Sequence, residues 1–495
     1  MTNLASNLLA TAAKSPERTA IILNENSLSF AELDAASAQM AGYLVAQGIE
    51  PGDRVALMVP NVPAFAVIYY GVLRIGGVVV PMNPLFKVRE IEYYLTDSGA
   101  KMIFAMPGEA EAGADAAGST FVPVEGADTI AMAGIIGEAT PVTDVVDRDD
   151  SDTAVILYTS GTTGRPKGAE LTHANLNSNQ DVTARTLLKL TDADVVMGCL
   201  PLFHVFGMTC GLNTVVATGA SLTLVPRFDP DTALDVIARD KVTVFEGVPT
   251  YYMAMLGKAA DRETDLSSLR LAVAGGSSLP VEVLHQFEKT FGCMILEGYG
   301  LSETSPVASF NHPDADRKPG SIGFPIEGVQ MAVVDDTGAE VPAGENGEIV
   351  IRGDNIMRGY WNKADATAEA IKDGWFHSGD LARRDSDGYF YIVDRIKDMI
   401  LRGGLNVYPR EVEEVLYEHP AIAEAAVIGI PHETLGEDVA AFVVLAPGAT
   451  AEPAEISQFV KDRLAAYKYP RQVTVIDALP KTATGKILKR ELPRD

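Results

Sequence analysis

Short apolar runs alternate with amphipathic stretches along the first 300 residues of the chain. Residues 54–59 (RVALMV), 154–158 (AVILY) and 293–300 (CMILEGYG) are typical of buried strands. Residues 64–74, and the segment that follows the capping residue Ser29, instead carry apolar side chains at helical spacing. Buried strands separated by helices predict an α/β fold whose parallel or mixed sheets are covered by helices on both faces.

The pattern changes in the last third of the chain. From about residue 320, Gly-rich turns separate β segments and predict hairpins, which indicates a β-rich subdomain. A compact α+β segment follows, with a helix predicted to begin at Pro409. We place the domain boundary near Lys397. This gives a large N-terminal domain, residues 1–396, and a small α+β C-terminal domain, residues 397–495.

Composition narrows the classes of partner. The formal net charge of −27 argues against nucleic acid or an anionic membrane as the main partner. Cys199, Cys210 and Cys293 have no pairing or metal-ligand spacing, which is typical of reduced thiols in a cytoplasmic protein. The most apolar stretch, residues 65–81, is interrupted by Arg74, so we expect a helix followed by a buried strand rather than a membrane span. We therefore expect a cytoplasmic protein with small-molecule partners.

A loop rich in glycine and hydroxyl groups, residues 158–168 (YTSGTTGRPKG), follows one of the predicted strands. Such a loop offers backbone N–H groups, hydroxyls and the cation of Lys167 to a phosphate. It departs from the P-loop pattern G-x-x-x-x-G-K-[ST], because Gly168 follows the lysine. A P-loop ATPase or kinase is therefore the weaker alternative. The candidate phosphate-binding residues are Thr159, Ser160, Gly161, Thr162, Thr163, Gly164 and Lys167.

Three further motifs carry groups that suit nucleotide chemistry. GYGLSET (298–304) ends with Glu303, a candidate Mg²⁺ ligand. WFHSGDLARR (375–384) places Asp380 at a predicted strand–loop junction, where a carboxylate can bind both ribose hydroxyls. Arg395 follows shortly afterwards, and PKTATGK, close to the end of the chain, provides Lys486.

With these motifs in this order, the chain resembles the adenylate-forming superfamily over essentially its whole length. That superfamily contains acyl- and aryl-CoA synthetases, firefly-type luciferases and the adenylation domains of peptide synthetases. The resemblance implies an AMP-forming ligase that uses ATP, Mg²⁺ and coenzyme A. A carboxylic acid and ATP would give acyl-AMP and pyrophosphate, and CoA would then give acyl-CoA and AMP.

The resemblance also implies roles for individual nucleotide-site residues. The loop Thr159–Lys167 would hold the β- and γ-phosphates, Tyr299 would stack on adenine and Ser302 would contact the α-phosphate. Glu303 would bind Mg²⁺. The further residues that it assigns to the ATP site are Gly275, Gly276, Ser277, Gly300, Asp380, Ile392 and Arg395.

Other implied roles concern the reacting groups and the second half-reaction. Lys486 would bridge the substrate carboxylate and the α-phosphate, and His204 would gate the passage between nucleotide and acid. Lys397 occupies the hinge position of a mobile C-terminal domain. Gly403 and Gly404 would line the CoA channel after that domain rotates.

The acid is predicted from the candidate pocket, whose residues are almost all apolar or small. These residues are Phe203, Phe206, Met208, Val248, Tyr251, Gly298 and Val307. Buried CH₂ groups favour binding by about 0.8 kcal/mol each, so medium- to long-chain fatty acids are the preferred substrates. An amino-acid substrate is disfavoured, because Gly207 stands where the relatives that activate amino acids carry an aspartate after the phenylalanine.

Several alternatives remain open on the sequence. The ligase could activate a 4-coumarate-like aryl acid, or could load an acyl group onto a carrier protein. A luciferase would need the same first half-reaction. A catalytically silent binding protein on this fold is disfavoured by the intact Lys167, Glu303, Asp380, Arg395 and Lys486. A homodimer is compatible with the sequence.

Overall fold

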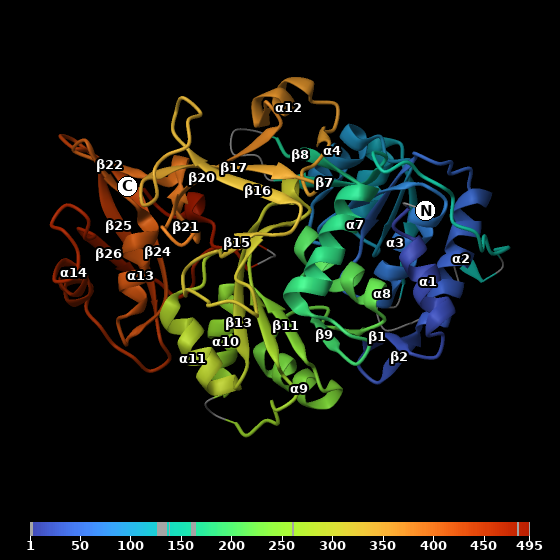
Figure 1. Ribbon diagram of the computed structural model, residues 1–495, viewed down its shortest axis with the longest axis horizontal. Coiled ribbons are helices and arrows are strands. Elements are labelled where there is room, and N and C mark those ends of the chain that lie inside the picture. The colour runs from blue at the N-terminus through green and yellow to red at the C-terminus, as the bar shows by residue number, and fades with distance from the viewer. Residues whose placement is uncertain are drawn as a thin grey trace.

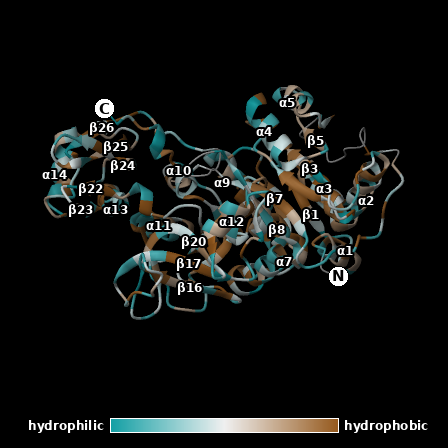
Figure 2. Ribbon diagram, turned by 90° about the horizontal axis from the view of Figure 1, so that it is seen from above, coloured by the Kyte–Doolittle hydropathy of each residue, from teal (hydrophilic) through white to brown (hydrophobic). Residues whose placement is uncertain are grey.

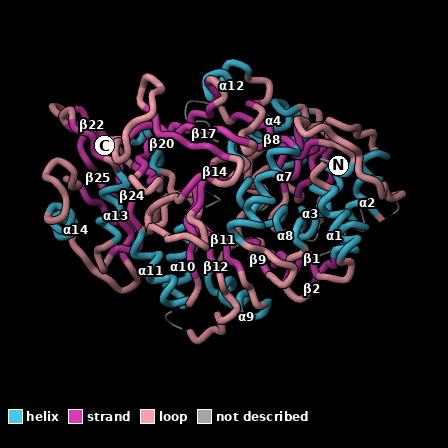
Figure 3. Tube along the Cα trace, viewed as in Figure 1, coloured by secondary structure: helices cyan, strands magenta, loops and turns pink. Residues whose placement is uncertain are grey.

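The computed structural model contains four sheets and the helices that flank them (Figure 1). The N-terminal sheets and the C-terminal sheet lie at opposite ends of the molecule's long axis. Helices cover the sheets, and the apolar strands lie inside more polar helices (Figures 2 and 3). The predicted α/β fold class is confirmed. The structure describes residues 3–125, 136–137, 139–159, 165–259, 262–482 and 485–494.

The first sheet has seven strands and contains the predicted strands near residues 54, 78 and 154. Its central strands are parallel, and β7–β8 and β8–β18 are antiparallel. Strand β6 forms one edge of this sheet. The order is β18 (Gly359–Tyr360), β8 (Lys167–Thr172), β7 (Thr153–Thr159), β4 (Val78–Pro81), β3 (Arg54–Met58), β5 (Met102–Ala105) and β6 (Thr120–Pro123).

The second sheet has nine strands and is parallel from β13 to β1, with antiparallel strands at both edges. Its central strands are buried on both faces and accordingly read as continuous apolar runs. The order is β15 (Phe324–Pro325), β14 (Val307–Phe310), β13 (Met294–Gly300), β12 (Leu271–Ala274), β11 (Val244–Gly247), β9 (Val195–Gly198), β10 (Ser221–Leu224), β1 (Thr19–Leu23) and β2 (Asn26–Ser29).

The helix that the capping residue Ser29 predicts begins directly after it. The Ser29 hydroxyl accepts a hydrogen bond from the Glu32 backbone N–H at 3.2 Å, and the Glu32 carboxylate accepts one from the Ser29 N–H at 2.8 Å. The helices that cover these two sheets are α1 (Ser6–Lys14), α2 (Phe30–Ala46), α3 (Pro63–Arg74), α4 (Val88–Ser98), α5 (Glu109–Ala117), α7 (His173–Val182), α8 (Thr214–Thr218), α9 (Pro230–Asp240), α10 (Pro249–Ala259) and α11 (Val281–Phe291). Two π-helices, η1 (Thr183–Leu188) and η2 (Phe206–Asn213), were not predicted.

The third sheet is antiparallel and confirms the predicted hairpins. Its order is β16 (Val329–Val334), β17 (Asn346–Gly353), β20 (Trp375–Arg384) and β19 (Ile371–Lys372), and β21 (Phe390–Arg395) also pairs with β20. One expectation is wrong. Asp380 lies within β20 and not at a strand–loop junction, because the strand continues to Arg384. Helix α12 (Ala364–Ala370) precedes β19.

The fourth sheet contains only residues after 399. Its order is β23 (Leu405–Val407), β22 (Ile400–Arg402), β25 (Gly436–Leu445) and β24 (Ile422–His432), with β26 (Gln472–Val475) also paired to β25. Helices α13 (Pro409–Tyr417) and α14 (Pro453–Lys461) accompany it, and its buried residues form two clusters of their own. Leu479 and Leu492, close to the end of the chain, are buried in one of these clusters.

Arg74, the charge that interrupts the most apolar stretch of the chain, has a structural role. Every residue of α3 is buried, including this arginine at its last position. Its guanidinium pairs with Asp34 and donates hydrogen bonds to the Thr143 carbonyl, at 2.6 Å, and to the Ser37 hydroxyl, at 3.1 Å. The arginine thus fixes α3 against α2 and the segment that enters β7. No helix in the described part of the chain is both long and apolar enough to cross a membrane.

We expect Arg74→Leu to destabilise the N-terminal region by roughly 3 kcal/mol, since it leaves Asp34 and buried carbonyl groups without their partner. A lower midpoint of thermal unfolding by calorimetry would report this loss. Arg185→Leu is the matched control, because that arginine is half exposed and its ion pairs with Asp181 and Glu327 lie at the surface. Equal midpoints for the two variants would contradict the role of Arg74.

Candidate active site

The predicted phosphate loop connects two antiparallel strands. Thr159 ends β7, Lys167 begins β8, and the two residues pair across the hairpin. A P-loop instead leads from a strand into a helix, so this topology argues against the P-loop alternative. The predicted loop residues Ser160, Gly161, Thr162, Thr163 and Gly164 lie outside the described residues.

Glu303 lies beside the base of this hairpin. It follows β13 in the short helix η3 (Ser302–Thr304) and is buried. Its carboxylate accepts hydrogen bonds from the Tyr360 hydroxyl, at 2.9 Å, and from the Thr159 side chain. The Lys167 ammonium lies 5.0 Å from the centre of the Tyr360 ring. Tyr360 therefore lies next to both Glu303, the predicted Mg²⁺ ligand, and Lys167, the predicted phosphate ligand. Tyr360 itself was not predicted, because one tyrosine among sixteen gives no signal in the sequence.

The surroundings of Glu303 suit Mg²⁺. Mg²⁺ is usually held by one or two carboxylates together with phosphate oxygens and water. Burial raises the pKa of Glu303 above its usual range, and a bound cation would offset that effect. Within the described ranges, no group of three or more His, Cys, Asp or Glu side chains could hold a metal ion alone. A cation at Glu303 would therefore need oxygens from the nucleotide.

The two predicted ribose ligands lie together at the junction of the second and third sheets. Asp380 and Arg395 pair across β20 and β21, and the Arg395 Nε lies 3.1 Å from Asp380 Oδ1. The Tyr299 hydroxyl donates to the other carboxylate oxygen, Oδ2, at 2.6 Å. The predicted adenine residue thus contacts a predicted ribose residue. Tyr299 lies in β13, immediately before the short helix that carries Glu303.

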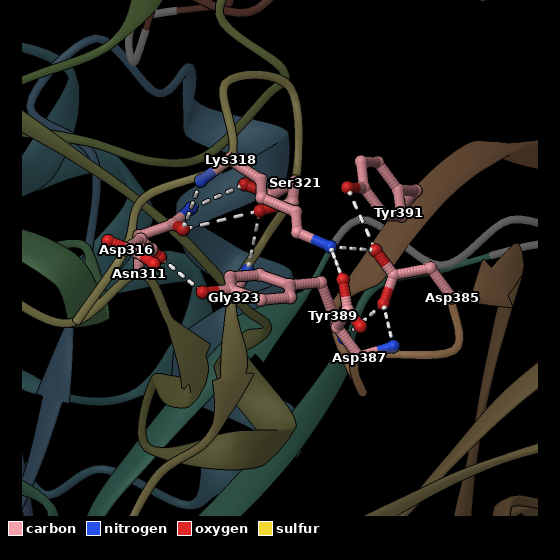
Figure 4. A network of polar contacts seen from close by, with 9 residues as sticks. All are labelled: Asn311, Asp316, Lys318, Ser321, Gly323, Asp385, Asp387, Tyr389 and Tyr391. Carbon is pink, nitrogen blue, oxygen red and sulfur yellow. Dashed lines mark hydrogen bonds and ion pairs between the residues drawn. The ribbon is translucent and has the colours of Figure 1, made fainter.

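A cluster of polar contacts anchors the other end of the β20–β21 hairpin (Figure 4). The Lys318 ammonium donates to Asp385 and Asp387 in the turn of the hairpin, at 2.6 Å each. Tyr389, which ends that turn, donates from its hydroxyl to the Asp316 carbonyl. We call Lys318, Asp385, Asp387 and Tyr389 the hairpin clamp. It fixes the two strands that carry Asp380 and Arg395.

Lys486 lies within electrostatic range of Arg395 and Asp380. Desolvation by surrounding protein atoms and the positive charge of Arg395 lower the pKa of Lys486 to about 8, while Asp380 opposes the shift, and the residue as a whole remains exposed. His204 is a further neighbour, because burial and the charge of Lys486 lower its pKa to about 4. In its neutral form, His204 adds no positive charge to those of Lys486 and Arg395. The loop of Lys486 is held from the N-terminal region, where the Thr250 hydroxyl donates to the Gly485 carbonyl at 3.3 Å.

Phe206, a predicted residue of the acid pocket, is the first residue of η2 and lies against Gly275. A Cβ atom on Gly275 would lie 2.8 Å from the Phe206 ring, so the missing side chain lets the ring cover the end of β12. Val248 and Tyr251 are buried at the start of α10, where the Tyr251 ring stacks on Phe228 at 3.7 Å.

The other predicted pocket residues differ in their surroundings. Met208 is fully buried and packs in the main core, and Val307 is also buried, whereas Phe203 is half-buried. A Cβ atom on Gly298 would lie 2.0 Å from the Phe310 ring, so a glycine is needed where β13 meets β14. A Cβ on Gly300 would meet the Pro306 carbonyl at the same distance.

The remaining predicted residues of the ATP site and of the CoA channel lie in a loop, a strand and a turn. Gly276 has a φ of +78° directly after Gly275, and Ser277 next to it is exposed. Ile392 lies in β21, three residues before Arg395. Gly403 and Gly404 form the turn between β22 and β23, where the Gly403 N–H donates to the Leu435 carbonyl at 2.8 Å.

Two family models match the chain. One, described as "AMP-binding enzyme", covers residues 8–361, and one, described as "AMP-binding enzyme C-terminal domain", covers residues 411–486. The chain is 39% identical to a long-chain-fatty-acid–CoA ligase of Bacillus subtilis strain 168, over 99% of this chain and 94% of that protein. It is 40% identical to a feruloyl-CoA synthase of an Amycolatopsis species, over 98% and 97%.

Comparison with solved structures agrees with these sequence matches. The ATP-bound form of MatB from Rhodopseudomonas palustris is 35% identical, with a TM-score of 0.91 over 99% of this chain and 97% of that one. The apo form of the same protein, with 34% identity and the same coverage, has a TM-score of 0.79. The chain therefore belongs to the AMP-binding enzyme family, within the adenylate-forming superfamily that its motifs indicated.

Proposed function

We propose that the protein is an ATP-dependent, AMP-forming ligase that joins a carboxylic acid to coenzyme A. The observation that carries this proposal is that Lys486, from the C-terminal region, interacts electrostatically with Asp380, Arg395 and His204. The charge of one lysine then acts on the residues predicted to bind the ribose and to gate the passage to the acid. The 35–40% identity to acyl- and aryl-CoA-forming relatives supports the same chemistry.

The chemistry of the first half-reaction explains these residue types. A carboxylate that attacks the α-phosphate is repelled by the phosphate oxygens. Lys486 would neutralise both groups as they approach, in a partly water-excluded site. Asp380 would bind the ribose hydroxyls, with Arg395 and Tyr299 fixing its orientation. Lys167 would hold the leaving phosphates, and Mg²⁺ at Glu303 would stabilise their charge.

The relative placement of the C-terminal region agrees with this assignment. The chain superposes on the ATP-bound form of MatB with a higher TM-score than on its apo form, 0.91 against 0.79. We therefore assign the present arrangement of Lys486 to adenylate formation. Thioester formation would require the C-terminal domain, residues 397–495, to rotate about Lys397 and bring Gly403 and Gly404 to the site.

Two classes of acid remain candidates. Medium- to long-chain fatty acids are favoured by the apolar residues around Phe206 and by the fatty-acid ligase of Bacillus subtilis. Aryl acids are favoured by the feruloyl-CoA synthase, which is 40% identical over nearly the whole chain. Transfer to a carrier protein in place of CoA is the further alternative.

The function is tested by two assays on the purified protein. Exchange of pyrophosphate into ATP that depends on the added acid reports adenylate formation, and AMP release that requires CoA reports the ligase. Straight-chain acids should be compared with acetate, malonate, benzoate and 4-coumarate. Acid-dependent exchange without CoA-dependent AMP release would point to the carrier-protein alternative, and the absence of exchange with every acid would contradict the proposal.

Lys486→Ala should lower the rate of acid-dependent pyrophosphate exchange at least 100-fold. Formation of acyl-CoA from supplied acyl-adenylate should be largely retained, because the phosphate is no longer attacked in that step. Lys481→Ala is the matched control on the same loop, since that lysine pairs with Glu424 at 2.6 Å. An equal loss of both half-reactions in Lys486→Ala would rule out the assigned role.

The pKa of Lys486 predicts the alkaline limit of adenylate formation. The cationic form is required, and a pKa of about 8 in the free enzyme means that the cation is lost as the pH rises through 8. We expect kcat/KM for ATP, which reports the free enzyme, to fall toward tenfold per pH unit above that value. Lys486→Arg should extend the plateau upward, because arginine stays charged. A wild-type profile that stays flat to pH 10 would contradict this prediction.

Lys397→Pro should separate the two half-reactions in the opposite sense. Proline fixes φ at one value, so a pivot at this residue would be blocked. Pyrophosphate exchange should remain near the wild-type rate, while CoA-dependent AMP release should fall at least tenfold. Lys397→Ala, which leaves φ free, is the control. If the proline variant transfers acyl groups to CoA at the normal rate, the pivot lies elsewhere.

A further inference from the structure

Glu246 is a buried carboxyl group that the adenylation chemistry does not use. It lies in β11, is 1% exposed, and its Oε1 has no hydrogen-bond partner. Burial raises its pKa to about 8, so the group is mainly protonated near neutral pH. Among the residues that the structure describes, no Lys, Arg or His forms an ion pair with it. An unpaired polar atom this deep in a protein is uncommon and requires an explanation.

The side chain of Glu246 points to one defined face of the sheet. Its neighbour Phe245 contacts the rings of Tyr252 in α10 and Phe287 in α11, at 5.2 and 6.2 Å. Successive side chains of a strand point to opposite faces, so Glu246 faces away from these helices. On that side it meets η2, where a Cβ atom on Gly211 would lie 3.5 Å from Oε2. The carboxyl group therefore lies against the backbone of the π-helix that begins with Phe206.

Two independent measures give the depth of Glu246 behind Phe206. Along η2, Gly211 follows Phe206 by five residues, the span of one hydrogen-bonded turn in a π-helix. Across the sheet, Glu246 pairs with Val273, while the Phe206 ring covers Gly275, which lies two residues after Val273 and directly follows β12. Two residues of strand span about 7 Å. Both measures place the carboxyl group about one aromatic ring's length behind Phe206.

We propose that Glu246 is a specificity-determining residue that binds a hydroxyl group at the end of the substrate remote from the reacting carboxylate. This inference rests on the proposed function, since it needs an acid that enters past Phe206. A protonated carboxyl group donates one hydrogen bond and accepts others, as a hydroxyl group does, so the two groups match. The depth suits a phenolic acid. An alkyl chain in the same place would leave Oε1 unpaired.

The experiment compares two acids that differ only in this hydroxyl group. The values of kcat/KM for CoA-dependent AMP release are measured with 4-hydroxycinnamate and cinnamate, with decanoate as the alkyl acid. We expect the wild type to prefer 4-hydroxycinnamate over cinnamate at least tenfold, because loss of one partner leaves the carboxyl group unpaired. Glu246→Met should bring this ratio near one, mainly through slower use of 4-hydroxycinnamate. Glu246→Gln, whose amide still donates and accepts, should retain part of the preference.

Tyr252→Phe is the matched control, because it removes a buried hydroxyl group behind the opposite face of β11 and should leave the ratio unchanged. Equal use of the two cinnamates by the wild type, or an unchanged ratio in Glu246→Met, would overturn the inference while the ligase assignment stands. If Glu246→Met does not fold, the ratio in Glu246→Gln decides, and a value equal to that of the wild type contradicts the proposal. No AMP release with any acid would instead refute the proposed function and this inference together.

Discussion

The site depends on one electrostatic arrangement, in which Asp380 pairs with Arg395 and attracts the nearby Lys486. Arg395 is paired directly with this carboxylate, and Lys486 lies close enough for the charge of Arg395 to lower its pKa. In a protein with a net charge of −27, a polyphosphate is attracted only where cations gather. The arrangement also joins distant parts of the sequence, since β20, β21 and the C-terminal loop must all be in place for it to form.

Much of the fold and of the nucleotide site could be predicted from the sequence. Buried parallel strands appear as uninterrupted apolar runs, so β3, β7 and β13 were found within one or two residues. Asp380 and Arg395 were predicted as partners in one site, and they are neighbours across a hairpin. The position of Asp380 within its strand was missed, because a polar residue after Gly379 is typical of a strand end.

Other features could not be predicted, because they depend on contacts between distant segments. Tyr360 acquires its place only when β18 pairs with β8 and meets Glu303. Glu246 follows an apolar run and looks like an ordinary strand end, so its burial against η2 is a property of the assembled sheet. The π-helical winding of η2 has no periodic signature in eight residues. The pocket residues inferred from the sequence therefore did not include this carboxyl group.

The hairpin clamp has a consequence for how this site can change during evolution. Lys318, Asp385 and Asp387 contact neither Asp380 nor Lys486, yet they fix the far end of the strands that carry the predicted ribose ligands (Figure 4). Substitutions in this turn would alter the rigidity of the hairpin without removing any of the predicted nucleotide ligands. Selection thus has a position outside the predicted site at which the geometry of Asp380 and Arg395 can be adjusted in small steps, while both residues stay unchanged.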